Sequence, residues 1–243
     1  RDSSTSRGLG DVYKRQGYIS GSANPFDWGP QYSTDEEWKS SNPIEVAALD
    51  YFVNNAGSPN GVINGGIAIF ASGNESAPSA SYPAAYPEFV SVAATAADYT
   101  PASYTNYGPG TTISAPGGDQ DYYYEYGEGF SRGAVGCILS TVPTNVSESG
   151  YAFFEGTSMA CPHVSGIVAL ALSYANQLRK QFTPDEIKSI LYETATPIDS
   201  YFEGTKLTYK FVTDLGDNTA LQMKLDDFKG KMGAGQINAT AML

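Results

Sequence analysis

A serine stands where a short run of small polar residues leads into a long apolar segment. The stretch reads GTSMACPHVSGIVALAL, and it places Ser158 two residues after Gly156 and directly after Thr157. If the segment is a helix, its first N–H groups and its positive potential would stabilise a negative oxygen beside the serine. A rigid helix would also fix the direction of attack. The pattern therefore suits a nucleophile, and the competing interpretation is a serine or threonine that only caps the helix.

The single histidine of the chain, His163, lies five residues after this serine. Five residues turn an α-helix by about 500°, so the two side chains would point about 140° apart. A serine nucleophile needs an adjacent, hydrogen-bonded base. We therefore predict that His163 packs as a structural residue, and that the base for Ser158 has to come from outside these 243 residues.

Three segments carry helix signals that could position these side chains. Residues 42–55 have apolar residues at helical spacing behind an Asn-Pro start, which is a common way to begin a helix. A second helix is predicted from Thr183, which forms a capping box with Glu186. The third runs from Ser158 to about residue 179, and it is apolar nearly all round, so we expect it to be buried.

Four short apolar runs have the length and composition of buried strands. They cover residues 65–74, 88–95, 111–117 and 136–141. Buried strands that are separated by helices and loops favour a parallel sheet. We therefore predict an α/β fold for the chain.

The chain divides into a short tail and one domain with two insertions. Residues 1–16 hold four of the fourteen basic residues and no hydrophobic periodicity, so we interpret them as adapter-derived sequence, with a native disordered tail as the alternative. Residues 17–243 are predicted to form one partial domain. The insertion near 118–130 is acidic and Tyr-rich, and it reads as a solvated loop or as one that contacts substrate or cations. The insertion near 201–230 predicts a surface β-hairpin.

The overall charge and the cysteines limit the partners of the protein. A net charge of -12 argues against nucleic acid as a partner. No apolar run reaches the roughly 18 residues of a membrane span, so none is predicted. Cys137 and Cys161 are too few for a metal-ligand cluster, and we expect either two buried thiols or one disulfide. Nothing in the sequence indicates an oligomeric state.

Four stretches match segments of one protein family, in the order that the family has them. GTSMACPHVSG (156–166) is similar to a serine nucleophile motif, and ASGNE (71–75) to a segment that carries an oxyanion-hole asparagine. Residues 82–117 are similar to a run of Tyr-Pro-Ala, a buried strand, a Ser/Asn turn, Gly-Pro and Ala-Pro-Gly. Residues 233–243 are similar to a glycine turn and the start of a last helix. The family that these stretches resemble is the subtilisin-like serine proteases, or subtilases.

This resemblance implies a subtilisin-like three-layer fold, in which a mostly parallel sheet lies between helices. It also implies a serine endopeptidase that acts on polypeptides, with Ser158 as nucleophile, Asn74 as the side-chain donor to the oxyanion, and Thr157 beside them. The chemistry would need no cofactor, while structural calcium is expected from family habit and the acidic loops, without a readable set of ligands. The family also implies a secreted, periplasmic or cell-surface location. Small residues would contact the substrate, namely Ala71, Ser72, Gly73, Gly156 and Gly17.

The chain departs from the family in one respect. Subtilases place a catalytic Asp and His before the oxyanion asparagine, and no histidine precedes Asn74 here. The resemblance therefore implies a truncated endopeptidase, with its N-terminal portion missing and with little activity, because loss of a triad member leaves only residual catalysis. One alternative is a non-catalytic, peptide-binding module of the same fold. The other is an unrelated esterase or lipase, but its nucleophile motif needs Gly where Ala160 stands.

Overall fold

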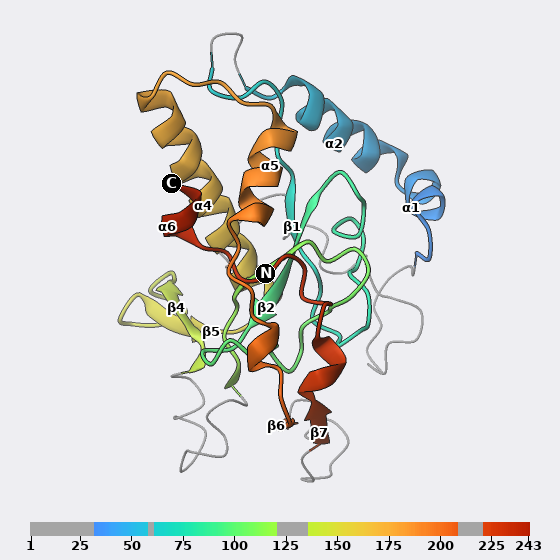
Figure 1. Ribbon diagram of the computed structural model, residues 1–243, viewed down its shortest axis with the longest axis vertical. Coiled ribbons are helices and arrows are strands. Elements are labelled where there is room, and N and C mark those ends of the chain that lie inside the picture. Colours follow the sequence, from blue (N-terminus) through green and yellow to red (C-terminus); the bar gives the residue numbers. More distant parts are fainter. Residues whose placement is uncertain (1–31, 58–60, 121–135, 209–220) are drawn as a thin grey trace.

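Figure 1 shows the computed structural model of the chain. The predicted adapter-derived tail and Gly17 lie outside the described residues, as do most of the acidic insertion and the tip of the predicted hairpin. The residues that the structure describes are 32–57, 61–120, 136–208 and 221–243.

Three short parallel strands form the centre of the fold (Figure 1). They are β1 (Ile69–Ala71), β2 (Val90–Thr95) and β3 (Ile113–Pro116), and they lie side by side in the order β1-β2-β3. Every residue of β2 is buried, as expected for a strand covered on both faces. The predicted parallel α/β sheet is confirmed, and each strand is shorter than the apolar run that marked it.

One face of the sheet packs against α4 (Thr157–Gln177). Ile69 pairs in register with Val90, and Val92 with Ile113. These four side chains belong to one hydrophobic core together with the inner face of α4. The helix that begins at the candidate nucleophile is therefore anchored on all three strands of the sheet.

The opposite face of the sheet is covered by α2 (Pro43–Asn55), next to α1 (Asp35–Ser41). Phe70 of β1 packs there with Phe89, at 5.2 Å between ring centroids. The helix predicted over 42–55 is confirmed, and Pro43 is its first residue. Helices on both faces of a parallel sheet make the three layers that the sequence predicts.

The predicted capping box is present at the start of α5 (Pro184–Glu193). Thr183 Oγ1 accepts a hydrogen bond from Glu186 N at 3.2 Å, and Thr183 N donates to Glu186 Oε2 at 2.7 Å. The last part of the chain runs beside β3, where Ser114 bridges to Gln236, and it ends in the short helix α6 (Ala239–Met242), whose N-cap is Asn238.

The run predicted as a fourth buried strand belongs to a different structure. Strand β4 (Ile138–Thr141) pairs with β5 (Tyr151–Phe154) in an antiparallel ribbon of two strands, apart from the parallel sheet. Its residues alternate between partly buried and exposed, because only one face of the ribbon lies against the domain. The prediction of a buried parallel strand at 136–141 is therefore wrong, and β5 was not predicted.

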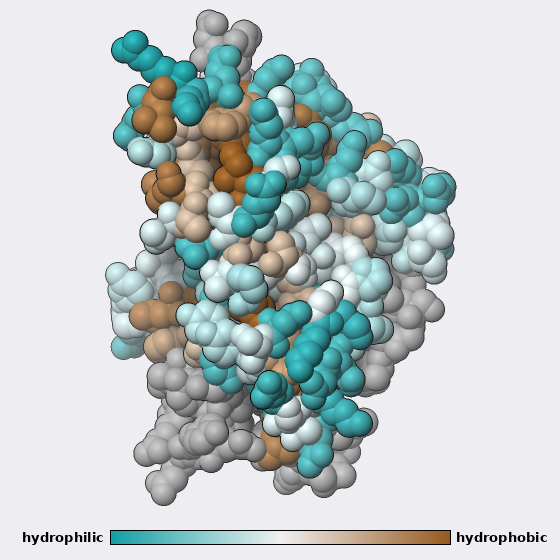
Figure 2. Space-filling model, viewed as in Figure 1, coloured by the Kyte–Doolittle hydropathy of each residue, from teal (hydrophilic) through white to brown (hydrophobic). Residues whose placement is uncertain are grey.

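The prediction that α4 is buried all round is also wrong. Its inner face lies on the sheet, but Leu170 is 51% and Tyr174 43% exposed, and Figure 2 shows apolar surface over this helix. Among the described residues, α4 is also the one helix long and apolar enough to cross a membrane by length and composition alone. Both observations follow from its apolar composition, which exceeds what one packed face needs.

The predicted surface hairpin is present as strands β6 (Thr205–Thr208) and β7 (Leu221–Lys224), which pair antiparallel. Its turn lies outside the described residues. Short 3-10 helices flank the two strands, η4 (Asp199–Tyr201) before β6 and η6 (Leu225–Phe228) after β7. The two cysteines are thiols rather than a disulfide, with Cys161 buried and Cys137 partly buried.

Candidate active site

Two turns that are distant in sequence meet at the C-terminal end of β1. The first is the turn that follows the strand and carries Asn74, and the second is the start of α4. Asn74 Oδ1 accepts hydrogen bonds from Thr157 N and from Thr157 Oγ1, both at 2.9 Å. Gly73 N lies 3.4 Å from Thr157 Oγ1, to which it donates. The structure thus brings together three of the predicted site residues, Gly73, Asn74 and Thr157.

These contacts determine which way the Asn74 amide faces. A backbone N–H can only donate, so the Asn74 atom that meets Thr157 N must be the carbonyl oxygen. The amide nitrogen Nδ2 is therefore directed away from Thr157 N and is available as a donor. A Cβ atom built on Gly156 would lie 3.8 Å from this nitrogen. Gly156 also has a φ of 149°, a conformation that L-residues with side chains rarely adopt.

Ser158 occupies the first turn of α4, next to the Asn74–Thr157 contact. It is 2% exposed. Met159 N and Ala160 N both donate to Gly156 O, at 2.9 and 3.2 Å, so the helix begins regularly around the serine. The low exposure of Ser158 was not expected, because a nucleophile has to be reached by its substrate.

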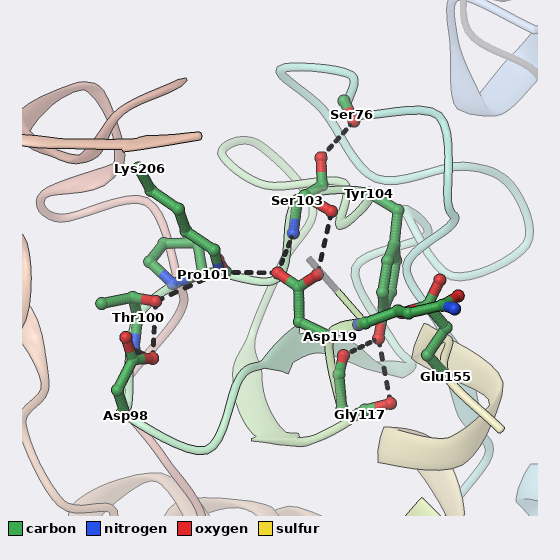
Figure 3. A network of polar contacts seen from close by, with 12 residues as sticks. Ser76, Asp98, Thr100, Pro101, Ser103, Tyr104, Gly117, Asp119, Glu155 and Lys206 are labelled. Carbon is green, nitrogen blue, oxygen red and sulfur yellow. Dashed lines mark hydrogen bonds and ion pairs between the residues drawn. The ribbon is translucent and has the colours of Figure 1, made fainter. Parts of the chain in front are cut away.

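The glycine before the helix is held by a buried tyrosine. Tyr104 is fully buried. Its hydroxyl accepts a hydrogen bond from Gly156 N at 2.8 Å. The same hydroxyl can donate to the carbonyl of Gly117, at 3.0 Å, or to that of Gly118, at 2.5 Å (Figure 3). Burial, followed by the carboxylates of Glu155 and Asp119, raises the pKa of Tyr104 well above its ordinary value. The hydroxyl therefore stays protonated and can donate and accept at once.

A buried ion pair lies beside this tyrosine (Figure 3). Asp119 is fully buried, and Lys206 of β6 approaches it at 2.5 Å. Ser103 N and Ser103 Oγ also donate to the Asp119 carboxylate, at 2.7 and 3.1 Å. Within the described part of the chain, no three His, Cys, Asp or Glu side chains cluster in a way that could hold a metal ion.

His163 lies on α4, five residues after Ser158. Its Nδ1 is 2.8 Å from Met159 O of the same helix. The ring is thus engaged with the helix backbone and not with the Ser158 side of the site, in line with a structural role.

The predicted substrate-contacting residues differ in their placement. Ala71 ends β1, is partly exposed, and lies directly before the turn that carries Asn74. Ser72 is fully buried and its Oγ donates to Asn106 O at 3.2 Å, so its side chain faces the interior. Gly156 adjoins the Asn74 amide, as described above. Gly17 lies outside the described residues.

Three polar residues around the site were not singled out from the sequence, namely Tyr104, Asn106 and Asp119. All three are fully buried. Tyr104 and Asn106 stand in ASYTNYGPG, and Asp119 follows APGG. Buried side chains of this kind look like loop residues in a sequence, because polar turns are usually exposed. The match of 82–117 to a family segment pointed to the region of Tyr104 and Asn106, and Asp119 falls in the acidic insertion near 118–130, which was interpreted as a loop.

Comparison with known proteins gives this geometry a family context. The sequence model of the Subtilase family matches residues 19–225. Subtilisin BL from Lederbergia lenta is 33% identical over 186 residues, which cover 76% of this chain and 58% of that protein. An extracellular basic protease from Dichelobacter nodosus is 34% identical over 136 residues, or 54% of this chain and 20% of that protein. The chain thus spans less than two thirds of the length of these relatives.

A solved structure supports the fold. The patellamide maturation protease PatA superimposes with a TM-score of 0.51 at 20% identity, over 93% of this chain and 58% of that one. This likeness agrees with the predicted subtilisin-like α/β architecture. Together with the family match over most of the sequence, it leads to one conclusion: this chain belongs to the subtilase family of serine peptidases.

Proposed function

We propose that this chain carries the nucleophile and the oxyanion donors of a serine endopeptidase, whose general base and orienting Asp are not among its residues. Ser158 is the nucleophile in this proposal, and Asn74 Nδ2 and Ser158 N are the donors. The observation that supports it best is the pair of 2.9 Å hydrogen bonds from Thr157 to Asn74 Oδ1. They leave the other end of the same amide as a donor beside the start of α4.

The proposed reaction is acyl transfer. The Ser158 hydroxyl attacks the carbonyl carbon of a peptide bond, and its proton passes to the base. The carbonyl oxygen becomes an oxyanion, which Asn74 Nδ2 and the positive end of α4 stabilise. The C–N bond then breaks, the amine leaves with the proton that the base returns, and water hydrolyses the ester on Ser158. Each such donor contributes about 10²–10³ in kcat, a magnitude that was itself measured on a subtilisin.

The substrate is proposed to be an extended polypeptide. Main-chain groups of Ala71 at the end of β1 would pair with it by strand addition, with Gly73 next to them and Gly156 on the other side. Gly17 remains part of this proposal, although it lies outside the described residues. Small residues at these positions leave room for a peptide backbone.

We infer an exported protein without a membrane span. The relative from Dichelobacter nodosus is an extracellular protease, and a net charge of -12 suits a soluble protein. The inner face of α4 packs against all three strands of the sheet, which accounts for part of its apolar composition. No cofactor is needed for the chemistry, and structural calcium remains a proposal without assigned ligands.

A second candidate function is a peptide-binding module without catalysis. The 2% exposure of Ser158 favours it, as does the presence of a single histidine that bonds to its own helix. An esterase or lipase is disfavoured, because a nucleophile elbow needs Gly at the position of Ala160.

A fluorophosphonate probe tests the proposal, because it reacts with activated serines. The chain as given is expected not to react rapidly, whereas the protein expressed from its complete gene should be labelled stoichiometrically at Ser158. Ser158→Ala should abolish that labelling. Ser165→Ala is the matched control, because Ser165 lies on the same helix and its Oγ donates to Cys161 O at 3.2 Å. Rapid labelling of the chain alone would contradict the proposal that the general base is not among its residues. A complete protein that is never labelled would favour the peptide-binding module without catalysis.

A further inference from the structure

The segment between β2 and β3 contacts both halves of the candidate site. From this segment, Tyr104 reaches the glycine before α4, as described above. Two residues later, Asn106 reaches the turn after β1 that carries Asn74. One short stretch of chain is therefore bonded to both turns, which also contact each other through Thr157, Asn74 and Gly73.

The side chain of Asn106 is bonded at both of its ends. Its Oδ1 accepts from Glu75 N and from Ala77 N, both at 3.0 Å. Its Nδ2 donates to Glu75 Oε2 at 2.7 Å, to Ser81 Oγ at 3.1 Å and to Ser72 O at 3.2 Å. The residue is fully buried. Most of these partners lie within three residues of Asn74, on both sides of it.

Further hydrogen bonds join the turn after β1 to the segment that contains Tyr104 and Asn106. Asn106 N donates to Gly73 O at 3.0 Å, and Ser76 N donates to Tyr104 O at 2.9 Å. Ser76 Oγ donates to Ser103 O at 2.6 Å (Figure 3). The turn after β1 is therefore bonded to the segment 103–106 on both sides of Asn74.

The fit between the two segments is close. A Cβ atom on Gly73 would lie 2.2 Å from Asn106 Nδ2, and Gly73 has a φ of 119°. Only glycine tolerates both conditions. The planar amide of Asn106 supplies two acceptor sites and two donors in fixed directions, which neither a hydroxyl nor an aliphatic side chain can supply.

We propose that Asn106 is a positioning residue, which holds the turn of residues 72–77 so that Asn74 meets Thr157 with its oxygen and faces the start of α4 with its nitrogen. This inference rests on the proposed function, because it assigns Asn74 the role of oxyanion donor. Asn106 acts through Asn74 and does not itself contact the substrate.

A purely structural role would predict a different outcome. Most buried polar side chains are hydrogen-bonded and contribute to global stability. Loss of such a contribution increases the opening of all core amides alike, whereas loss of a positioning residue acts first on the turn that it holds. The amide of Thr157 is a direct reporter, because its hydrogen-bond acceptor is Asn74 Oδ1.

Hydrogen exchange in the chain itself provides the test. We compare the protection of the Thr157 amide in wild type and Asn106→Ala, using Ser114→Ala as the control. Ser114 is equally buried, and its Oγ donates to Met232 O at 2.7 Å, away from the site. Protection of Thr157 should fall by about tenfold or more beyond the fall in the buried α5 residue Leu191. In Ser114→Ala both amides should change by the same factor.

Asn106→Asp provides a second variant if the alanine variant does not fold. Asp keeps the shape and the acceptors for Glu75 N and Ala77 N but loses the donors, and it places a second carboxylate against that of Glu75. Thr157 should again lose protection relative to Leu191. Equal changes at the two amides, or an unchanged Thr157, in whichever variant folds would overturn the proposal.

The exchange experiment requires no catalysis, so its failure is distinguishable from failure of the proposed function. In a form of the protein whose Ser158 is labelled by the probe, Asn106→Ala should also slow labelling by about tenfold or more, while Ser114→Ala leaves the rate unchanged. If Ser158 is never labelled but Thr157 responds as stated, the peptidase proposal fails and the positioning role stands.

Discussion

The buried pair of Asp119 and Lys206 gives a prediction whose size follows from the structure. Lys206 comes from β6 of the surface hairpin, and its side chain is 10% exposed while that of Asp119 is fully buried. Lys206 Nζ also donates to Pro101 O at 3.0 Å. One lysine therefore connects the hairpin to the loop before Tyr104, next to the candidate site.

Replacing Lys206 by Met leaves the Asp119 carboxylate buried without its countercharge. Breaking a buried pair in this way typically costs about 3–5 kcal/mol. Ser103 still donates two hydrogen bonds to the carboxylate, so we expect a loss near the lower end, about 3 kcal/mol. The double variant Lys206→Met with Asp119→Asn removes both charges, and it should recover most of this loss, because no buried charge remains.

Urea unfolding followed by far-UV circular dichroism measures these free energies. Lys229→Met is the matched control: it removes the same side chain from a pair with Asp226 at 2.6 Å whose side chains are 42% and 62% exposed, and exposed pairs often contribute nothing measurable. A Lys206 variant that unfolds at the same urea concentration as the Lys229 variant would refute the reasoning. So would a double variant that is as unstable as the single one.

Three further predictions concern other parts of the molecule. Burial raises the pKa of Glu45 from 4.5 to about 7, so the folded state binds the proton more tightly than the unfolded state. The free energy of unfolding should therefore fall by about 1 kcal/mol between pH 4.5 and 7, after allowance for partial exposure. Glu45→Gln should remove this fall in urea titrations, and an unchanged pH dependence in the variant would contradict the role of Glu45. Thr183→Ala should destabilise the protein by about 1 kcal/mol through loss of the cap. A variant with the same melting temperature as the wild type would contradict a contribution of the capping box to stability. In a form of the protein that turns over peptide, Asn74→Ala should lower kcat by about 10²–10³ with little change in KM, and a loss confined to KM in steady-state kinetics would show that Asn74 binds substrate instead.

The elements that could be predicted are those whose signals are local. The capping box of Thr183 and Glu186 depends on two residues three apart, and the structure contains it as predicted. The strand β2 has no charged residue, and all of its residues are buried because both of its faces are covered. Such patterns are complete within one short stretch of sequence.

The elements that could not be predicted depend on distant partners. β4 was assigned to the parallel sheet because its composition is apolar, whereas its antiparallel partner β5 is a run of aromatic residues without strict alternation. The exposed face of α4 could not be foreseen either, because composition alone does not show which side of a helix meets the sheet. Both wrong predictions concern which face of a strand or helix is covered by the rest of the protein. The sequence of a single segment does not contain that information.

The site shows the same division. The family resemblance singled out Asn74 and Thr157, and in the structure Thr157 N donates a hydrogen bond to Asn74 Oδ1 at 2.9 Å. Asn106 was missed because a buried polar residue in a turn cannot be told from an exposed one until its partners are known. Its five side-chain hydrogen bonds go to residues between 25 and 34 positions away in the chain.

The central claim is that Ser158 and Asn74 serve one tetrahedral centre, and a crystal structure of the complete protein with a peptide boronate tests it most directly. We expect a bond between boron and Ser158 Oγ, with one boronate oxygen about 2.7–3.1 Å from Asn74 Nδ2. Boron bonded to another residue, or an Asn74 amide that is turned away from the boronate oxygen, would contradict a shared role of Ser158 and Asn74.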